Sequence, residues 1–284
     1  MNLRFRSSRM VCRNGWKVGV ATMLLGIGCA WADDDGSGHE PQTNPLTSRA
    51  VDHTAGSQIR IHEGSQAPET EAPVVQTIGC DVSSYQGNVN WSSAASAGTK
   101  FAYIKATEAT GFKNINFAQQ YEGSHKHGLI RGAYHFAQPN ASSGTTQADF
   151  FLDNGGGWSA DGKTLPPALD IEYNPFGSIC FGLSAAAMVA WVRDFSDRVR
   201  ARTGRYPTIY TSANWWSRCT GNNGSFGSTH PLWIPRYGSS LRTLPAGWKF
   251  QTIWQDADAG SMPGDQDRFN GAYDRLQALA ANRD

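Results

Sequence analysis

The sequence predicts an α/β protein, an irregular TIM-like β/α barrel with fewer helices in its C-terminal third. Short apolar runs, rich in β-branched and aromatic residues and bounded by Gly, Pro or Asn, are typical of buried strands. Helical stretches separate the earlier runs, and this alternation favours a parallel sheet. Seven or eight strands within about 209 residues fit a small closed barrel. The predicted strands are Thr77–Val82, Phe101–Ala106, Gly132–Phe136, Ala168–Ile171, Thr208–Thr211, Leu232–Ile234 and Phe250–Trp254.

Two helices are predicted between the earlier strands. The first covers Asn116–His127 and the second Ser184–Thr203. In the second, Ser184 is a suitable N-cap, apolar residues recur at helical spacing, and Gly204 ends the pattern. After Tyr206 the strands follow one another with little helix between them, so the last third of the barrel is expected to be irregular.

The first 32 residues are typical of an export signal. Basic residues precede the apolar run Val18–Cys29, and Ala30-Trp31-Ala32 matches the small-x-small cleavage pattern. An uncleaved anchor and lipidation at Cys29 are the alternatives, although the apolar run is short for a membrane span. The next stretch is polar and poor in aromatic residues, which predicts disorder. The predicted organisation is a signal peptide (1–32), a disordered linker (33–75) and a globular barrel (76–284), in a protein that is secreted or retained in the periplasm or cell envelope.

The charge balance argues against nucleic acid or membrane as a partner. Five of the 25 Lys and Arg residues lie before position 33, where there is no acidic residue. The remainder has 20 basic residues against 24 acidic ones, which gives no support for nucleic-acid binding or for stable membrane association after signal cleavage. The 10 Trp, 9 Tyr and 13 Phe residues fit sugar binding by ring stacking, although packing in a core explains most of them.

Cysteine usage agrees with export. Cys12 and Cys29 lie in the signal region, which leaves three cysteines and therefore one that has no partner within the chain. Cys180 and Cys219 lie in segments rich in Gly, Asn and Ser, as disulfide partners often do, so we pair them. Cys80 lies in an apolar strand and is expected to be a buried free thiol.

Two carboxylates end one predicted strand. In Leu165-Pro-Pro-Ala-Leu-Asp170-Ile-Glu172, the acids are two positions apart and share one face of the strand. On a barrel strand this face is the interior, at the carboxyl end where active sites form. Two close carboxylates do not both ionise readily, so the pKa of one rises. Glycoside hydrolysis needs this arrangement, a protonated acid beside an ionised partner.

Other candidate residues are less specific. Asp81 ends the first strand, where it is either a site residue or a cap for the Ser-rich turn. Asp265 and Asp267 follow the last predicted strand, in a turn that has too few acids for a calcium loop. A lone His135 between two aromatic residues is interpreted as a hydrogen-bonded barrel residue. No zinc-type spacing or phosphate loop occurs, so we expect no metal and no cofactor.

Together these motifs resemble the glycoside hydrolase family 25 lysozymes, the Chalaropsis-type N-acetylmuramidases. Each motif alone is weak, but eight of them in the family's order are very specific, and they run through nearly all of residues 77–279. The matching segments are Gly79–Gly87 followed by Trp91, Phe101–Glu108, Gly132–Phe136, Leu165–Glu172, Pro207–Thr211, Pro231–Tyr237, Trp254-Gln255 and Asp265–Gly271.

The resemblance implies an irregular barrel, with residues 76–284 as the catalytic domain, that cleaves the β-1,4 bond between N-acetylmuramic acid and N-acetylglucosamine in peptidoglycan. It implies that Glu172 is the general acid, and that Asp170 stabilises charge or orients the acetamido group of the substrate. Asp81 and Asp265 complete the acidic cluster, with Asp265 preferred to Asp267 by its distance from the closing Asn-Gly pair. Groove-lining aromatic residues are carried over at Tyr134, Tyr210, Trp233, Tyr237 and Trp254. The family also often bridges the loops where Cys180 and Cys219 lie.

The chain departs from the family at two positions. Pro235 replaces a frequent Ala or Gly and could shift a strand that lines the groove, and Cys80 replaces a more usual aliphatic or aromatic residue. Neither is a carboxylate, so activity is expected to survive.

Two rival functions differ in their acids. A silent peptidoglycan-binding module would keep the aromatic residues and lose an acid, but all four candidate acids are present. A family 18 chitinase would show a D-x-x-D-x-D-x-E strand, of which only Asp170 and Glu172 occur here. We therefore expect a monomeric hydrolase whose partner is the glycan strand of peptidoglycan.

Overall fold

A computed structural model describes residues 52–64, 75–237 and 243–283. The predicted signal peptide, residues 1–32, lies outside this part of the chain. Of the predicted linker, the structure describes 52–64 and residue 75. No helix in the described ranges is long and apolar enough to cross a membrane.

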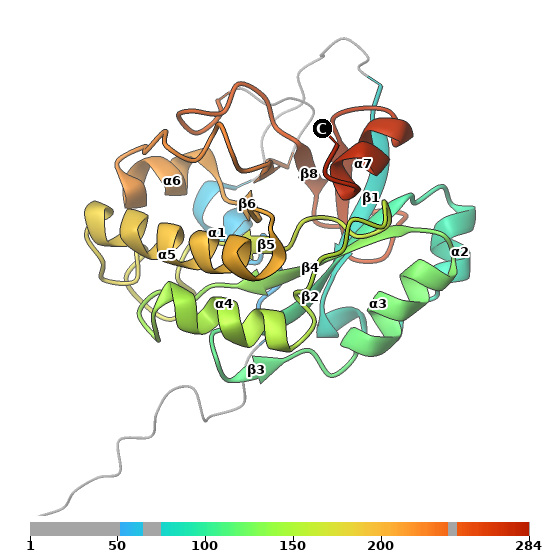
Figure 1. Cartoon of the computed structure of the whole chain (residues 1–284), viewed down its shortest axis with the longest axis horizontal. Helices are drawn as coiled ribbons and strands as arrows, with labels where there is room; N and C mark the ends of the chain where they lie inside the picture. Colours follow the sequence, from blue (N-terminus) through green and yellow to red (C-terminus); the bar gives the residue numbers. More distant parts are fainter. Residues whose placement is uncertain (1–51, 65–74, 238–242, 284) are drawn as a thin grey trace, which may run out of the picture. The chain divides into compact units, whose positions relative to one another are not determined.

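The strands of the described chain form one closed barrel (Figure 1). Its order is β1-β9-β8-β7-β6-β5-β4-β2, and pairing of β1 with β2 closes the ring. Neighbouring strands are parallel except at β9, which is antiparallel to both β1 and β8. The strands are β1 (Thr77–Val82), β2 (Phe101–Glu108), β4 (Ile130–Phe136), β5 (Ala168–Asp170), β6 (Thr208–Tyr210), β7 (Leu232–Pro235), β8 (Ile253–Ala257) and β9 (Asp265–Phe269), with the short β3 (Phe112–Lys113) antiparallel to β2.

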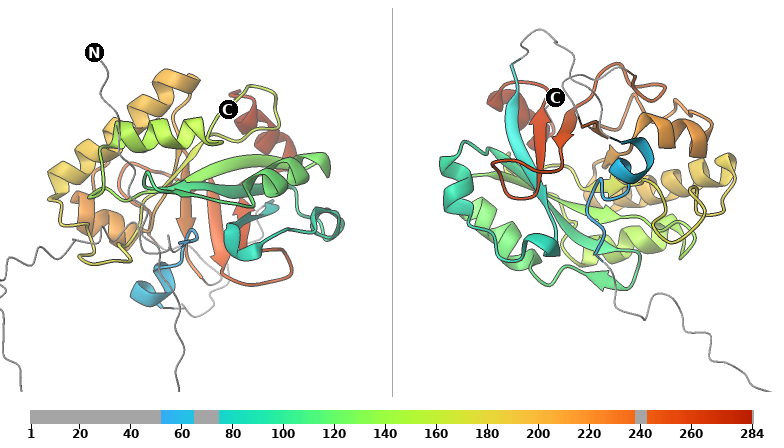
Figure 2. Two further views of the ribbon diagram at one scale, coloured as in Figure 1. Left: turned by 90° about the horizontal axis from the view of Figure 1, so that it is seen from below. Right: turned by 180° about the vertical axis from the view of Figure 1, so that it is seen from behind.

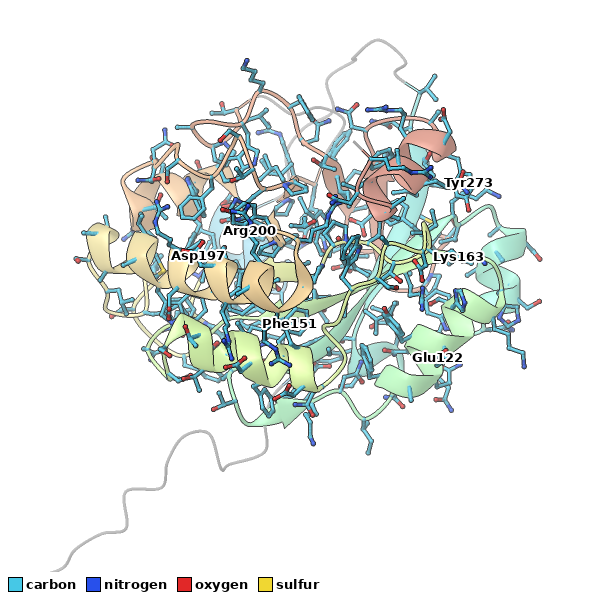
Figure 3. The ribbon with its side chains drawn as sticks, viewed as in Figure 1. Glu122, Phe151, Lys163, Asp197, Arg200 and Tyr273 are labelled. Atoms are coloured by element: carbon cyan, nitrogen blue, oxygen red, sulfur yellow. A yellow bond between two sulfur atoms is a disulfide. The ribbon has the colours of Figure 1, made fainter. Side chains whose placement is uncertain are left out.

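Helices surround this barrel (Figures 1 and 2). Exposed side chains such as Glu122, Asp197, Arg200 and Tyr273 mark their solvent faces, whereas Phe151 is buried beneath them (Figure 3). The helices are α1 (Ile59–Glu63), α2 (Trp91–Ser96), α3 (Phe117–Lys126), α4 (Gly144–Asp153), α5 (Ala185–Thr203), α6 (Ala213–Thr220) and α7 (Tyr273–Ala280), with a 3₁₀ turn η1 (Ser84–Gln86).

The long helix α5 follows the sequence signals closely. The hydroxyl of Ser184 accepts a hydrogen bond from the N–H of Ala187 at 3.3 Å, which caps the first turn. Gly204 ends the helix with φ +79°, a left-handed conformation that glycine adopts without strain. Between these ends, a buried stripe that includes Met188 and Phe195 packs toward α4 and the barrel.

The predicted irregular barrel is confirmed, but the sequence pattern misses its last strand. Asp265 and Asp267 lie in β9 rather than in a turn after the last strand. Their alternation places both acids on one face, directly beside β1, where Asp81 is the register partner of Asp265. A strand with polar residues facing the barrel interior lacks the apolar run that signals a buried strand, which is why the pattern did not reveal it.

Apolar residues fill two layers. Inside the barrel, large rings stack in layers, with the Tyr103 and Trp233 ring centroids 4.8 Å apart. Outside it, residues of α4, α5 and α6 pack against the outward face of the strands. These rings fill the barrel interior below the carboxyl ends of the parallel strands. A site is therefore expected at the carboxyl ends, where barrel enzymes have their active sites.

The predicted disulfide is confirmed. Cys180 and Cys219 are bonded, with their Cα atoms 5.3 Å apart, and Cys80 is a buried free thiol. Cys219 lies within α6 rather than in a loop, so the bond ties that helix to the turn before α5.

Removing this bond is expected to destabilise the fold. The double substitution Cys180→Ala, Cys219→Ala frees a loop with a sequence separation of 39 residues, which should lower the free energy of unfolding by about 4 kcal/mol. Urea denaturation of both proteins measures the difference. Cys80→Ala, which keeps the disulfide, is the control, and equal losses in the two variants would contradict the prediction.

Residues 52–64 are ordered against the barrel, contrary to the prediction of a disordered linker for that part of 33–75. The side chain of Ala55 is fully buried, and Ile59 at the start of α1 is 2% exposed. The segment has no apolar periodicity of its own, so its order comes from contacts with the barrel. Figure 2 shows the segment in blue beside the strands.

Candidate active site

Five carboxylic acids gather at the carboxyl ends of the parallel strands. Asp81 is in β1, Asp170 ends β5 and Glu172 follows two residues later, while Asp265 and Asp267 come from β9. Asp81, Asp170, Glu172 and Asp267 are at most 1% exposed. The barrel therefore brings together all four predicted acids and adds Asp267 as a fifth.

Gln255 connects the acids to the tyrosines, and the sequence reasoning did not single it out. Its amide nitrogen donates to Asp81 Oδ2 at 2.8 Å and to Asp265 Oδ2 at 3.2 Å. Its amide oxygen accepts hydrogen bonds from the hydroxyls of Tyr210, at 2.8 Å, and Tyr237, at 3.1 Å. The available signal was strand alternation, because Gln255 lies two positions after Ile253 and on the same interior face.

The predicted aromatic residues fall into three groups. Tyr210, Tyr237 and Tyr134 direct their hydroxyls to the level of the acids. Trp233 lies deeper, where its indole N–H donates to Asp267 Oδ1 at 2.8 Å. Trp233 is fully buried and forms part of the ring layer beneath the acids.

Trp254 is not with the acids. It alternates with Gln255 along β8, so its side chain lies on the outward face, and its indole N–H donates to the carbonyl of Arg236 at 2.8 Å. Its register partner is Ile234, which belongs to the packing layer outside the barrel. Within the described chain, nothing brings Trp254 into contact with the acidic cluster.

Burial raises the pKa of every acid in the cluster. It raises the pKa of Glu172 to about 8, although the backbone N–H groups of Gly56 and Gln58 partly oppose the shift. It raises the pKa of Asp265 to about 9, helped by the charge of Asp81. The pKa of Asp170 lies well above its usual range because of burial and then the charge of Glu172.

The remaining two acids shift in the same direction. Burial raises the pKa of Asp81 and of Asp267 well above the usual value. The charge of Asp267 raises the pKa of Asp81 further, whereas the hydrogen bond from Trp233 partly opposes the shift at Asp267. Neither carboxyl oxygen of Asp170 has a hydrogen-bond partner in the described chain, and one oxygen of Glu172 has none. Buried polar atoms without partners are rare in folded proteins, and here three of them belong to one pair of acids.

A buried ion pair borders the cluster. Lys105 Nζ, which is fully buried, lies 2.6 Å from Glu108 Oε2. Burial raises the pKa of Glu108, but the Lys105 ammonium and the His53 hydrogen bond outweigh it and lower the pKa to about 2. Glu108 is therefore ionised, in contrast to the acids of the cluster.

His135 has a structural environment. One ring nitrogen is 2.7 Å from Thr107 Oγ1 and the other is 3.0 Å from Gln147 Oε1. Burial lowers its pKa to about 4, so the ring is neutral. Among the described residues, no group of three or more His, Cys, Asp or Glu side chains could hold a metal ion.

Residues 52–64 lie directly on the cluster. The backbone N–H of Gly56 donates to Glu172 Oε1 at 2.8 Å. The hydroxyl of Tyr134 accepts from the N–H of Ala55 at 3.2 Å, and Gln255 donates to the carbonyl of Ala55 at 3.1 Å. An opening beside the segment is lined by Arg60, Asp258 and Asp265 among others.

The raised pKa values predict that the chain loses stability as pH rises. In the unfolded chain Glu172 has its ordinary pKa near 4.5, whereas in the folded chain the value is about 8. The folded state therefore holds more protons between these values, and the free energy of unfolding should fall as pH rises from about 4.5 to about 8. Asp265, Asp81, Asp170 and Asp267 act in the same direction.

Urea denaturation of the full chain at about pH 5 and at about pH 8.5 measures this effect, a pH interval chosen to bracket the titration of the buried acids. The variant Glu172→Gln cannot titrate at this position, so its loss of stability over the same interval should be smaller. Equal stability at the two pH values, or an equal loss in the variant, would contradict the assignment.

A closed barrel with a buried acid pair at the carboxyl end of one strand, ringed by further acids and tyrosines, is an arrangement that suits glycoside hydrolysis. The family model for glycosyl hydrolases family 25 matches residues 80–265. The chain belongs to this family and is a glycoside hydrolase of the lysozyme type.

Relatives of known name match most of the chain. Lysozyme M1 of Streptomyces globisporus is 51% identical over 237 residues, which cover 80% of this chain and 81% of that protein. An N,O-diacetylmuramidase of Chalaropsis sp is 50% identical over 206 residues, covering 71% of this chain and 98% of that protein. The solved muramidase from Acremonium alcalophilum has a TM-score of 0.71 and 53% identity, and covers 72% of this chain and 99% of its own.

Proposed function

We propose that this enzyme hydrolyses the β-1,4 bond between N-acetylmuramic acid and N-acetylglucosamine in peptidoglycan, with Glu172 as the general acid. The observation that carries the proposal is the pair Asp170 and Glu172, buried together at the carboxyl end of β5. Relatives named muramidase and N,O-diacetylmuramidase support the substrate class.

Glu172 is suited to donate a proton to the leaving oxygen. Its pKa of about 8 keeps the carboxyl group protonated at neutral pH, and one of its oxygens has no hydrogen-bond partner in the described chain. Burial is the main cause of this shift. A protonated acid beside further carboxylates is the electrostatic requirement of glycoside hydrolysis.

Asp170 is the group that meets the positive charge or the acetamido group of the sugar. Its two unpaired oxygens can accept a substrate N–H or stabilise a cationic sugar ring. Asp81 and Asp265, which both accept hydrogen bonds from the amide of Gln255, place two further carboxyl groups beside this pair. Tyr134, Tyr210 and Tyr237 provide hydroxyls and ring faces on its wall.

Product analysis tests the bond that is cut. Purified peptidoglycan is digested with the chain comprising residues 76–284, the fragments are reduced with borohydride, and their ends are identified by mass spectrometry. Fragments that end in reduced muramic acid are expected. Ends in reduced glucosamine would show a different glycosidase, and binding without any cleavage would show a silent peptidoglycan-binding module.

We also propose that the chain is exported as a monomer, with residues 1–32 removed. The Cys180–Cys219 disulfide supports an oxidising compartment. Mass spectrometry of the mature protein tests the cleavage, because an intact N-terminus would exclude removal after Ala32.

A further inference from the structure

We infer that residues 52–64 inhibit the enzyme in cis by occupying the glycan groove. The inference rests on the proposal that the buried acids are the catalytic groups. Asp81, Asp170 and Glu172 are at most 1% exposed while the segment lies over them. A glycan strand cannot contact an acid that no solvent reaches, so the segment must leave before a substrate can bind.

The N-terminal end of the segment contacts the buried ion pair of Lys105 and Glu108. Asp52 Oδ1 lies 2.7 Å from Lys105 Nζ, and the carbonyl of His53 accepts from the same ammonium at 2.5 Å. The ring of His53 is 2.8 Å from Glu108 Oε1. Asp52 also accepts a hydrogen bond from the backbone N–H of Ser84 at 2.9 Å.

In the middle of the segment, backbone peptide groups form the hydrogen bonds that the acetamido group of a bound sugar would form. Gly56 donates its N–H to Glu172, and its carbonyl accepts from the hydroxyl of Tyr237 at 3.3 Å. The peptide groups of Ala55 engage Tyr134 and Gln255 in the same way. An amide N–H and C=O are the donor and acceptor that an N-acetyl group carries, so the segment satisfies the same polar groups as the proposed substrate.

Only glycine fits at the centre of this contact. A Cβ atom on Gly56 would lie 2.2 Å from the hydroxyl of Tyr237 and 2.6 Å from Gln255 Oε1. Its φ of +86° is also a conformation that other residues rarely adopt. Any side chain at position 56 therefore pushes the segment away from the acids.

The second end is anchored by α1. Ile59 is 2% exposed and belongs to the apolar layer that contains Ile234 and Tyr237. Glu63 accepts hydrogen bonds from Tyr173, at 2.9 Å, and from Ser212. Anchors on both sides of the cluster hold the middle of the segment across it.

A second, independent observation is the length over which this chain matches a relative. The match to Lysozyme M1 of Streptomyces globisporus covers 80% of this chain, whereas residues 76–284 make up less than three quarters of its 284 residues. The similarity therefore extends into the residues before the barrel. This relative thus shares part of the chain that precedes the catalytic domain.

Two substitutions in the full chain test the inhibition. Gly56→Val introduces the clash described above, and Ile59→Asn places an amide in the apolar layer, so both should release the segment. Each should raise the initial rate of peptidoglycan hydrolysis about tenfold or more over the unchanged chain. The matched control is Ile61→Asn, the same change at a side chain that is 72% exposed, which should leave the rate unchanged. Equal rates in all four proteins would overturn the inference.

Hydrogen exchange separates this inference from the proposed function, because it does not depend on hydrolysis. The amides of Ala55 and Gly56 should be protected in the unchanged chain and in Ile61→Asn, and should exchange rapidly in Gly56→Val. Rapid exchange in the unchanged chain would show that the groove is open and would overturn the inference. Hydrolysis by none of the proteins, with the amides still protected, would instead contradict the proposed function and leave the segment placed in the groove.

Discussion

Glu172→Gln is expected to lower the rate of glycan hydrolysis at least about a hundredfold, because the amide cannot donate a proton to the leaving oxygen. Glutamine has the shape of the protonated acid, which is the form that burial favours at neutral pH. It should also keep the hydrogen bond from the N–H of Gly56, since its amide oxygen can replace Oε1 in the full chain. The fold should therefore remain intact while the chemistry is lost.

The measurement is the loss of turbidity of a peptidoglycan suspension, made with residues 76–284 so that the segment over the acids does not affect the rate. Asp274→Asn is the matched control, an acid-to-amide change on helix α7, where the side chain is exposed. Wild-type activity in Asp274→Asn beside a large loss in Glu172→Gln would support the assignment. A rate for Glu172→Gln within a few-fold of the wild type would assign the proton to another group.

Asp170→Asn is expected to reduce the rate by about a hundredfold or more and at the same time to stabilise the fold. Burial and the charge of Glu172 raise the pKa of Asp170 well above its usual range, so the folded chain disfavours the ionised form. Asparagine removes this cost above neutral pH. It also removes the carboxylate that would stabilise a cationic sugar ring or accept the acetamido N–H.

The two effects have separate readouts. The rate is measured as for Glu172→Gln, and the free energy of unfolding is measured by urea denaturation at about pH 8.5, where an ordinary aspartate is fully ionised. A lower rate together with a higher free energy of unfolding would show that Asp170 is required for catalysis and destabilises the fold. Loss of activity together with lower stability would instead show that Asp170 supports the structure.

Local sequence patterns are enough to predict the class of fold and most of the acidic cluster. Short apolar runs that end at Asp81 and at Asp170 placed these acids at the carboxyl ends of parallel strands, and the barrel confirms that placement. The signals at Ser184 and Gly204 gave the bounds of α5, because capping depends on neighbouring residues alone. The disulfide between Cys180 and Cys219 was predicted from the composition of the segments around them and from the family resemblance, and the structure contains it.

The contacts between polar groups depend on how distant segments pair in the folded chain. Strand β9 is polar on its interior face, so it carries no apolar pattern, and its acids belong to the cluster only because it pairs with β1. Gln255 and Trp254 are neighbours in sequence, yet alternation along β8 sends one to the acids and the other outward. Residues 52–64 have too little apolar surface to order themselves, and they are ordered because buried carboxylates, tyrosine hydroxyls and Lys105 supply partners for their peptide groups and side chains. Such order depends on groups that are distant in sequence, and the composition of the segment alone does not reveal it.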